Sequence, residues 1–392
     1  MLANSSPEAV EVRDFSTATG GAPWDDLSRQ VYCVLGIPID AIDMASLLRT
    51  VEHAAIKGAP FLISTPNLNH LITSRRDPEF RETLLDSELC PADGMPIVWI
   101  ARLVGAPIGE RVAGSDMLPA LKARCPSLRR VRLFLFGGSA GVVEAAASAL
   151  NSNSVGLSCV GATNPGFGTI QELSQDHFIE EINASGADFL IAALGAQKGQ
   201  LWLQRNSCRL RVPIRAHLGA SLSFVAGSVR RAPAIVQKYG LEWLWRIKEE
   251  PYLWRRYLND GVNLCGLLLT QVLPLAIRSR YEMLRGHVQP DLVIEETRER
   301  GTVTLRLSGA ANALGTEKAI ATFKAAVATR MNIAVNLSNT RAIDARFFGL
   351  LLMARKRAKE VGAEMTFTDV SRRLRKLFKL NGVEFLLADS GR

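Results

Sequence analysis

Two short polar stretches each stand beside an apolar run, and both hold residues that could take part in chemistry. STPNLNH covers residues 64–70 and DGMPIVW covers residues 93–99. Asp93 precedes a glycine and lies in a predicted turn. Its carboxylate could cap a helix, the commoner role for this residue type. It could instead act as a general base, provided that it faces a cleft near a reacting hydroxyl. The residues alone leave both roles open.

A glycine-rich turn and one arginine are candidates for binding an anion. FLFGGSAG at 134–141 predicts a strand, a turn at Gly137 and Gly138, and the start of a helix. Backbone N–H groups at such a helix start suit a phosphate, although many tight turns need glycine for geometry alone. Arg111 could grip an anionic leaving group through its guanidinium fork. A surface arginine explains that residue equally well when it is taken alone.

Several common catalytic signatures are missing from the sequence. It has no HExxH, no Cys/His cluster at zinc spacing, no GxSxG, no Walker lysine loop and no DxD carboxylate pair. The five histidines are dispersed, and each is more simply structural. The sequence therefore predicts neither a metal site nor a cofactor.

The elements that must position these residues alternate along the chain. Apolar runs at 31–39, 61–65, 133–138 and 188–195 alternate with helical patterns such as 43–57, 67–76 and 140–150. Strands that are apolar throughout, each followed by an amphipathic helix, predict an α/β, Rossmann-like parallel sheet covered on both faces. Ligands of such sheets bind beyond the carboxyl ends of the strands. The residues predicted at these ends are Thr65, Asn67, Gly137, Gly138 and Gly195.

Composition divides the chain into four parts. Residues 1–25 form a predicted flexible tail, 26–235 the larger α/β domain, 236–290 a helical appendage and 291–392 a small, separate α/β domain. Residues 1–235 hold 21 Lys and Arg against 22 Asp and Glu, whereas residues 291–392 hold 18 against 11. The basic surface therefore lies outside the larger domain, and membrane phospholipid or nucleic acid would both suit it.

The appendage is rich in aromatic and basic residues. LEWLWRIKEEPYLWRRY is followed by an apolar stretch of about 15 residues, which is shorter than the ~20 needed to span a bilayer and is interrupted by Pro274. We expect either a helical subdomain packed on the core or a segment lying in the bilayer interface, and both can hold. The residues expected to face lipid or a lipid-linked acceptor are Trp243, Arg246, Arg255 and Arg256.

Taken in order, these stretches resemble the WecG/TagA/CpsF family of bacterial glycosyltransferases. The matching motifs, from about residue 31 to 257, are TPNLNHL, DPEFR, CPADGMPIVW, ERVAGSDM, LFLFGGSAG, NPGF, RAP and GLEWLWRIKEEP. The resemblance implies inverting, metal-independent transfer of a sugar from a UDP-sugar to a polyprenyl-diphosphate-linked saccharide. Such transfer builds cell-surface or exopolysaccharide at the cytoplasmic, inner face of the membrane, where the enzyme is peripherally associated.

The resemblance also implies roles for single residues. Asp93 would be the catalytic base, and Thr65 would line the same pocket. The residues implied in substrate binding are Asn67, Asn69, Arg111, Asp116, Gly137, Gly138, Gly195 and Gln200, and Arg231 would face the membrane or acceptor. Two departures lie in the presumed donor region. The family's Pro-Lys-Gln-Glu-like run ends here in Gly199 and Gln200, and Ser223 stands where an aspartate is usual.

The last domain resembles a STAS domain of the anti-sigma-factor-antagonist type, which implies a protein partner. Where many members carry a phosphorylatable hydroxyl, this chain has Asp344, Ala345, Arg346 and Phe347. Phosphorylation at that position is therefore excluded as a switch. The basic helix predicted at 372–380 has an apolar stripe for the domain core, and its basic face is a hypothetical membrane or partner contact.

Two functions of other classes compete with a transferase. A regulatory or scaffold protein would bind nucleotide sugar without turnover, its altered donor motifs having cost it catalysis. A nucleic-acid binder is suggested only by the charge of the last domain, which lacks a recognition motif and an aromatic stacking stripe, so we expect no nucleic-acid partner. Self-association as a homo-oligomer stays open.

Overall fold

The computed structural model describes residues 24–126, 129–284 and 290–388, so most of the predicted tail lies outside the described residues. Its centre is a five-stranded parallel sheet in the order β3-β7-β6-β4-β5. The strands are β3 (Phe61–Ile63), β4 (Val131–Gly137), β5 (Leu157–Thr163), β6 (Phe189–Ala193) and β7 (Ile214–His217). The predicted α/β, Rossmann-like class is confirmed.

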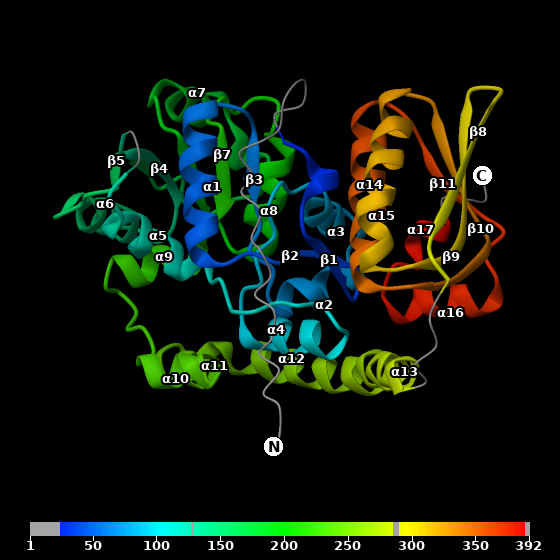
Figure 1. The fold of residues 1–392 in the computed structure, drawn as a ribbon. Coiled ribbons are helices and arrows are strands. Elements are labelled where there is room, and N and C mark those ends of the chain that lie inside the picture. The colour runs from blue at the N-terminus through cyan, green and yellow to red at the C-terminus, as the bar shows by residue number, and fades with distance from the viewer. Residues whose placement is uncertain (1–23, 127–128, 285–289, 389–392) are drawn as a thin grey trace, which may run out of the picture.

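Helices cover both faces of this sheet (Figure 1). Alternate residues of β4 point to opposite faces, so that Leu133 and Leu135 join one apolar cluster while Phe134 and Phe136 join another. The first face is covered by α1 (Met44–Lys57), α5 (Gly114–Ala123), α6 (Val142–Asn151) and α9 (Gly219–Val225). The second is covered by α7 (Asp176–Ala184) and α8 (Ala196–Arg205). This double cover explains why the strands read as continuous apolar runs.

The apolar run at 31–39 does not join the sheet, contrary to expectation. It forms an antiparallel hairpin of β1 (Val31–Val34) and β2 (Ile37–Asp40). Leu35 and Gly36 adopt positive φ angles of 50° and 98°, the turn geometry that reverses a chain within two residues. The hairpin is apolar on both sides because the larger domain packs on it from one side and the last domain from the other.

The last domain has its own sheet, in the order β11-β10-β9-β8. Its strands are β8 (Val293–Glu299), β9 (Thr302–Ala311), β10 (Asn332–Ile343) and β11 (Met365–Thr368), and only β8 runs antiparallel to its neighbour. Its helices are α14 (Ala313–Ala328), α15 (Ala345–Glu360), α16 (Arg372–Leu380) and α17 (Phe385–Ala388). The basic helix predicted at 372–380 is confirmed as α16, whereas β8 and α17 were not foreseen.

The two domains share one apolar core across the hairpin. Helix α15 packs on β1, and a side chain at Gly349 would place its Cβ only 2.1 Å from the carbonyl oxygen of Val31. At the hairpin turn, a Cβ on Gly36 would lie 2.5 Å from the carbonyl oxygen of Gly382. These glycines allow backbones of the two domains to touch, so the apolar core does not stop at the predicted domain boundary.

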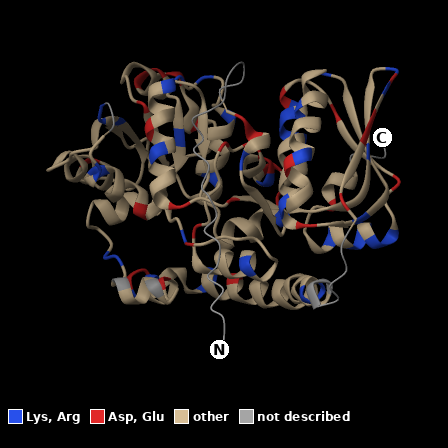
Figure 2. Cartoon of the chain, viewed as in Figure 1, with Lys and Arg blue, Asp and Glu red and all other residues tan. Residues whose placement is uncertain are grey.

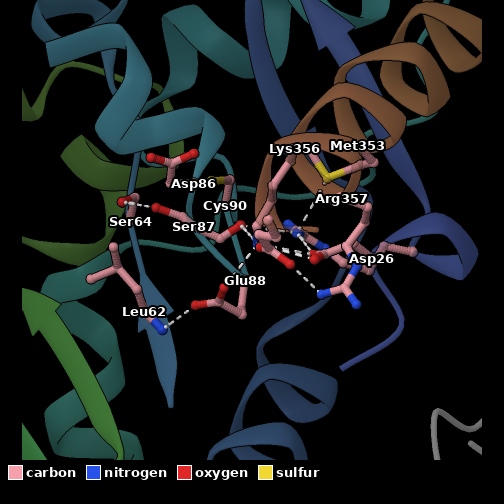
Figure 3. Close-up of polar contacts among 12 residues, drawn as sticks. Asp26, Leu62, Ser64, Asp86, Ser87, Glu88, Cys90, Met353, Lys356 and Arg357 are labelled. Atoms are coloured by element: carbon pink, nitrogen blue, oxygen red, sulfur yellow. Dashed lines mark hydrogen bonds and ion pairs between the residues drawn. The ribbon is translucent and has the colours of Figure 1, made fainter. Parts of the chain in front are cut away.

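A buried ionic network crosses the same junction, and Figure 3 shows its centre. Lys356 Nζ lies 3.1 Å from Asp26 Oδ2 and 2.8 Å from Glu88 Oε1. Arg29 pairs with Asp26 at 2.6 Å and with Asp40 at 2.7 Å. Burial alone would raise the pKa of Asp26, but Lys356 and Arg29 hold that pKa below its ordinary value. The charges compensate one another without water, which fixes the relative position of the segments that carry them.

The appendage lies along one edge of the molecule, at the bottom of Figure 1. It comprises α10 (Ala234–Lys238), α11 (Glu242–Glu249), α12 (Trp254–Leu267), a π-helical turn (Leu268–Val272) and α13 (Leu273–Leu284). Its buried side contacts α2 (Leu68–Arg76) and α4 (Met95–Leu103). Helix α3 (Pro78–Leu85) lies between α2 and the network.

The apolar stretch is part of a longer helix than the sequence suggested. Within the described residues, Pro251–Tyr281 forms one run of 31 residues that is long and apolar enough to cross a membrane by length and composition, a test that core helices also pass. Pro274 does not end the helix, because the π-helical turn directly before it widens the backbone where the proline ring would otherwise clash.

Breaking the buried network should destabilise the whole chain. We expect Lys356→Ala to lower the free energy of unfolding by about 3–5 kcal/mol, because it leaves Asp26 and Glu88 buried without their shared cation. Urea denaturation measures this change. Lys318→Ala, on the exposed side of α14, is the matched control and should cost less than about 0.5 kcal/mol. Equal losses in the two variants would contradict the role given to the network.

Candidate active site

The two polar stretches noted in the sequence lie side by side at the carboxyl end of β3. The main-chain N–H of Asp93 donates to the Pro66 carbonyl at 2.9 Å, and the N–H of Val112 donates to the Ala92 carbonyl at 2.9 Å. Gly114, the first residue of α5, donates its N–H to the Asp93 carboxylate. A Cβ on Gly114 would lie 3.3 Å from Thr65 Oγ1. Asp93 and Thr65 therefore flank the amino-terminal end of one helix.

Asp93 has a perturbed proton affinity. The pKa of its carboxyl is raised to about 7, chiefly by burial and also by the acids Glu242 and Asp116, whereas Arg111 and the Gly114 N–H act to lower it. The side chain is only partly buried, so it keeps access to the surface. A carboxylate that titrates near neutral pH can accept a proton from a hydroxyl and release it again in the same pH range.

A cluster of charged side chains joins this loop to the appendage. Arg111 bonds to Glu242 at 2.5 Å and to Asp116 at 3.2 Å, and Arg231 pairs with the other oxygen of Asp116. The structure thus brings together five of the predicted site residues, namely Asp93, Thr65, Arg111, Asp116 and Arg231. Two guanidinium groups that donate to carboxylates can instead donate to phosphate oxygens, which present a similar acceptor geometry.

Three predicted substrate-binding side chains have structural partners in this structure. Asn67 caps α2 by accepting the His70 N–H at 3.1 Å, and Asn69 Nδ2 lies 3.3 Å from Asp260 of the appendage. Gln200 is 2% exposed and donates to the Ser64 hydroxyl. Asn67 thus caps its own helix, Asn69 joins α2 to α12, and Gln200 joins α8 to the segment that follows β3, so their role in substrate binding stays a prediction.

The predicted glycines serve the geometry of the strand-to-helix turns. Gly137 has φ 106°, and a Cβ there would lie 2.6 Å from the Ala193 carbonyl oxygen. The N–H of Gly138 donates to that same oxygen at 2.9 Å, so it does not point at a ligand. Gly195 has φ 86° and precedes α8, with open space around the position of a Cβ. Of the three, Gly195 leaves the most room for a ligand.

Sequence reasoning missed His217 and Glu242. His217 ends β7, and its Nε2 atom is buried without a hydrogen-bond partner among the described residues. A Cβ on Gly199 would lie 2.1 Å from the His217 ring, so the imidazole fills the space that a side chain at 199 would need. A position at the end of a strand could have pointed to His217, but the strand that it ends, β7, was not predicted. Glu242 gave no local signal, because it reaches Arg111 only through folding of the appendage.

The residues expected to face lipid or acceptor differ in their surroundings. Trp243, Arg255 and Arg256 are exposed on the appendage. Arg246 is half-buried and pairs with Glu250, with an Nε to Oε2 distance of 3.1 Å, so its charge is largely compensated inside the chain. Among the described residues, no three His, Cys, Asp or Glu side chains are grouped to hold a metal ion.

Comparison with known proteins agrees with this architecture. The family model described as "Glycosyl transferase WecG/TagA/CpsF family" matches residues 32–277, and the model "Mlab, STAS domain" matches residues 294–388. The chain belongs to the WecG/TagA/CpsF glycosyltransferase family and carries a STAS domain at its carboxyl end.

Two curated relatives share the transferase part of the chain. The chain is 24% identical over 203 residues to the N-acetylglucosaminyldiphosphoundecaprenol N-acetyl-beta-D-mannosaminyltransferase of Bacillus spizizenii, covering 52% of this chain and 76% of the relative. It is 24% identical over 231 residues to the protein of the same name from Bacillus subtilis, covering 59% and 88%. Among solved structures, phosphorylated SpoIIAA of Bacillus is 21% identical and covers 24% of this chain and 88% of its own, with a TM-score of 0.22.

Removing the Asp93 carboxylate should stabilise the fold in a pH-dependent way. Because the pKa of this carboxyl is raised from 3.8 to about 7, the folded state is penalised as pH rises through that interval, and the full penalty is present above pH 7. We expect Asp93→Asn to raise the free energy of unfolding more at pH 8 than at pH 5.5, by about 1–2 kcal/mol. Urea denaturation at both values measures this, with Asp291→Asn at an exposed position as the control. A gain that does not change with pH would contradict the raised pKa.

Proposed function

We propose that the chain is an inverting, metal-independent glycosyltransferase. It moves a sugar from a UDP-sugar to a polyprenyl-diphosphate-linked saccharide, for synthesis of cell-surface or exopolysaccharide. The observation that carries the proposal is Asp93, held at the end of α5 with a pKa of about 7 and next to the Arg111 cluster. The names of both Bacillus relatives describe transfer of N-acetylmannosamine to an undecaprenyl-diphosphate-linked N-acetylglucosamine.

In this mechanism each residue has one task. Asp93 takes the proton of the acceptor hydroxyl while the oxygen of that hydroxyl attacks the anomeric carbon of the donor. The bond from that carbon to UDP breaks on the opposite face, which inverts its configuration. Arg111 and Arg231 stabilise the negative charge that develops on the departing diphosphate. Thr65, on the other side of Gly114, positions the reacting hydroxyl.

The arginine pair supports metal independence. Enzymes that hold a divalent cation on a diphosphate need carboxylates to bind it, whereas here Asp116 and Glu242 are already paired with guanidinium groups. The two arginines supply positive charge where the leaving group would depart. The carboxylates of Asp116 and Glu242 fix the geometry of the two guanidinium groups. Little reorganisation of the arginines is therefore needed when the diphosphate takes the place of these carboxylates.

The appendage supports peripheral binding at the cytoplasmic face of the membrane. Its outer side carries a row of exposed apolar residues spaced four or seven positions apart, which we call the apolar stripe: Trp254, Leu258, Val262, Leu269, Leu273 and Ile277. The opposite side packs on α2 and α4. Such a one-sided helix lies in the plane of the bilayer interface. A lipid-linked acceptor would be reached from the same plane.

In the STAS domain, one face of α15 packs on the β1–β2 hairpin of the same chain. Asp344 caps α15 by accepting the Phe347 N–H at 2.8 Å, and Arg346, 4% exposed, donates to the Val31 carbonyl at 3.1 Å. We infer that this domain supports the transferase domain through that face, and that a separate protein partner would use another surface.

A regulatory protein is the second candidate, and the departures from the family pattern at Gly199 and Ser223 favour it. Both positions lie in the presumed donor region. Such a protein would bind nucleotide sugar without turnover.

A transfer assay separates the two functions. The purified protein is incubated with a panel of UDP-sugars and short-chain polyprenyl-diphosphate saccharides in the presence of EDTA, and UDP release and product mass are measured. We expect one sugar to be added to the acceptor. UDP-sugar binding without transfer across the panel would favour the regulatory protein.

Asp93→Asn tests the proposed base. We expect transfer to fall by roughly 10²–10⁴-fold while donor affinity is kept, because the proton acceptor is lost but the arginines remain. Single-turnover kinetics and calorimetric titration with the UDP-sugar measure the two quantities. Asp291→Asn should leave both unchanged, and unchanged turnover in Asp93→Asn would remove that residue from the role.

Substitutions in the apolar stripe test membrane binding without removing core residues. We expect the triple variant L258Q/V262Q/L269Q to lose flotation with phosphatidylcholine vesicles, because three exposed apolar side chains no longer enter the interface. The matched control is I56Q/V155Q/L314Q, which changes three exposed apolar residues elsewhere on the chain. Flotation of both variants alike would contradict the proposed contact.

A further inference from the structure

Helix α16 of the STAS domain presents a basic face beside the appendage. Its sequence RRLRKLFKL buries Leu374, Leu377 and Phe378 in the shared core. The exposed positions are Arg372, Arg373, Arg375, Lys376 and Lys379, and Figure 2 shows them as a blue group at the lower edge of this domain. The helix is therefore almost wholly cationic on its solvent side.

Four of these five charges lack an acidic partner. In the part of the chain that the structure describes, Arg372, Arg375, Lys376 and Lys379 form no salt bridge, and Arg375 donates instead to the Val370 carbonyl. The first turn of α16 also has no acidic residue, and Arg372 stands at the positive end of the helix dipole, where a cation is unfavourable. A local arrangement that disfavours the isolated helix points to an external anion as the compensating group.

The basic face adjoins the appendage directly. Helix α16 contacts the π-helical turn Leu268–Val272, which carries Leu269 of the apolar stripe. Lys379 and Gln271 line a shared hollow of about 260 Å³, into which Arg75 also faces, with Glu384 as its one acid. Figure 1 places α16 next to α13 on the side of the molecule that carries the appendage.

We propose that α16 is a second membrane contact, which binds anionic phospholipid when the apolar stripe lies in the bilayer. The apolar stripe would set the depth of the molecule, and α16, which contacts the π-helical turn, would then lie near the headgroups, where each basic residue is attracted to a negative surface. Its long Lys and Arg side chains are exposed and could reach that surface. The hollow beside Lys379 is large enough to receive one phosphate headgroup.

The consequence is a membrane-orienting function for the STAS domain. The apolar stripe alone leaves rotation about the helix axis weakly defined. A second contact on the other side of the Lys356 network fixes the tilt of the whole molecule, since the two domains are held together there. The Asp93 loop would then face the bilayer at a constant angle. This inference rests on the proposed membrane binding of the appendage.

Flotation with two kinds of vesicle separates the two contacts. The full chain is mixed with vesicles of phosphatidylcholine alone, or of phosphatidylcholine with phosphatidylglycerol, at low and at high salt. Neutral vesicles report on the apolar stripe. The gain in affinity given by phosphatidylglycerol, here called the increment, combines α16 with the exposed Arg255 and Arg256 of the appendage, so the part of it that R372E/K376E removes reports on α16. We expect R372E/K376E to lose roughly 10- to 100-fold of the affinity for the anionic vesicles while its binding to neutral vesicles is unchanged.

The matched control reverses the same number of charges at the opposite edge of the same domain. Arg300 and Arg330 are exposed in turns at the far end of the sheet, so R300E/R330E should keep the gain in affinity that phosphatidylglycerol gives. The milder variant R372Q/K376Q should lose part of it, and thermal unfolding checks that all variants are folded. High salt should remove the increment from the unaltered chain.

Each outcome decides the matter. The inference is overturned if R372E/K376E keeps the higher affinity for anionic vesicles, or if R372E/K376E and R300E/R330E lose it equally. The basic face of α16 would then be left to an acidic protein partner. An unaltered chain that binds both vesicle types equally overturns the inference as well, while the proposed membrane binding of the appendage stands. If the chain binds neither vesicle, both fail. If it binds only anionic vesicles and R372E/K376E abolishes this, the inference holds and the proposed role of the apolar stripe fails.

Discussion

The buried charge network around Lys356 is the constraint on which the rest of the structure depends. Lys356 Nζ is almost entirely removed from water and is shared by Asp26 and Glu88, while Arg29 connects Asp26 to Asp40. A buried ion is tolerated only when its partners are in place, so the segments carrying these residues cannot move independently. The two domains of the chain are in this way held as one body.

The network also reaches the candidate active site through short covalent and hydrogen-bonded steps. Glu88 accepts from Lys356 with one oxygen and from the Leu62 N–H, on β3, with the other at 2.7 Å (Figure 3). Asp40 accepts the Cys90 N–H at 2.6 Å, three residues before Asp93. The last domain therefore supports both the strand that leads to Thr65 and the loop that carries the proposed base. This explains in physical terms why a small regulatory-type domain is packed onto an enzyme.

The same packing changes the role of the STAS domain. The loop that carries a phosphorylatable hydroxyl in many related domains here caps α15 and buries Arg346 against β1. A guanidinium at this position contributes to a contact within the chain. The basic side of α16 is left to the solvent, and this helix adjoins the appendage.

The sequence by itself determined the fold class and several local elements. Apolar runs and helical periods were sufficient to predict a parallel sheet, three of its strands and the helices α1, α2, α6 and α16, because these signals arise from neighbours along the chain. Asp93, Thr65 and Arg111 were selected by their motifs.

The tertiary structure alone decided that residues 31–40 form a hairpin. An apolar run that is buried on both sides has the same sequence pattern whether it lies in a parallel sheet or between two domains. It also decided that Asn69 bonds to Asp260, that Gln200 is buried, and that Glu242 and His217 stand at the site. Each of these depends on contacts between segments far apart in the sequence, and no pattern of neighbouring residues encodes such a contact.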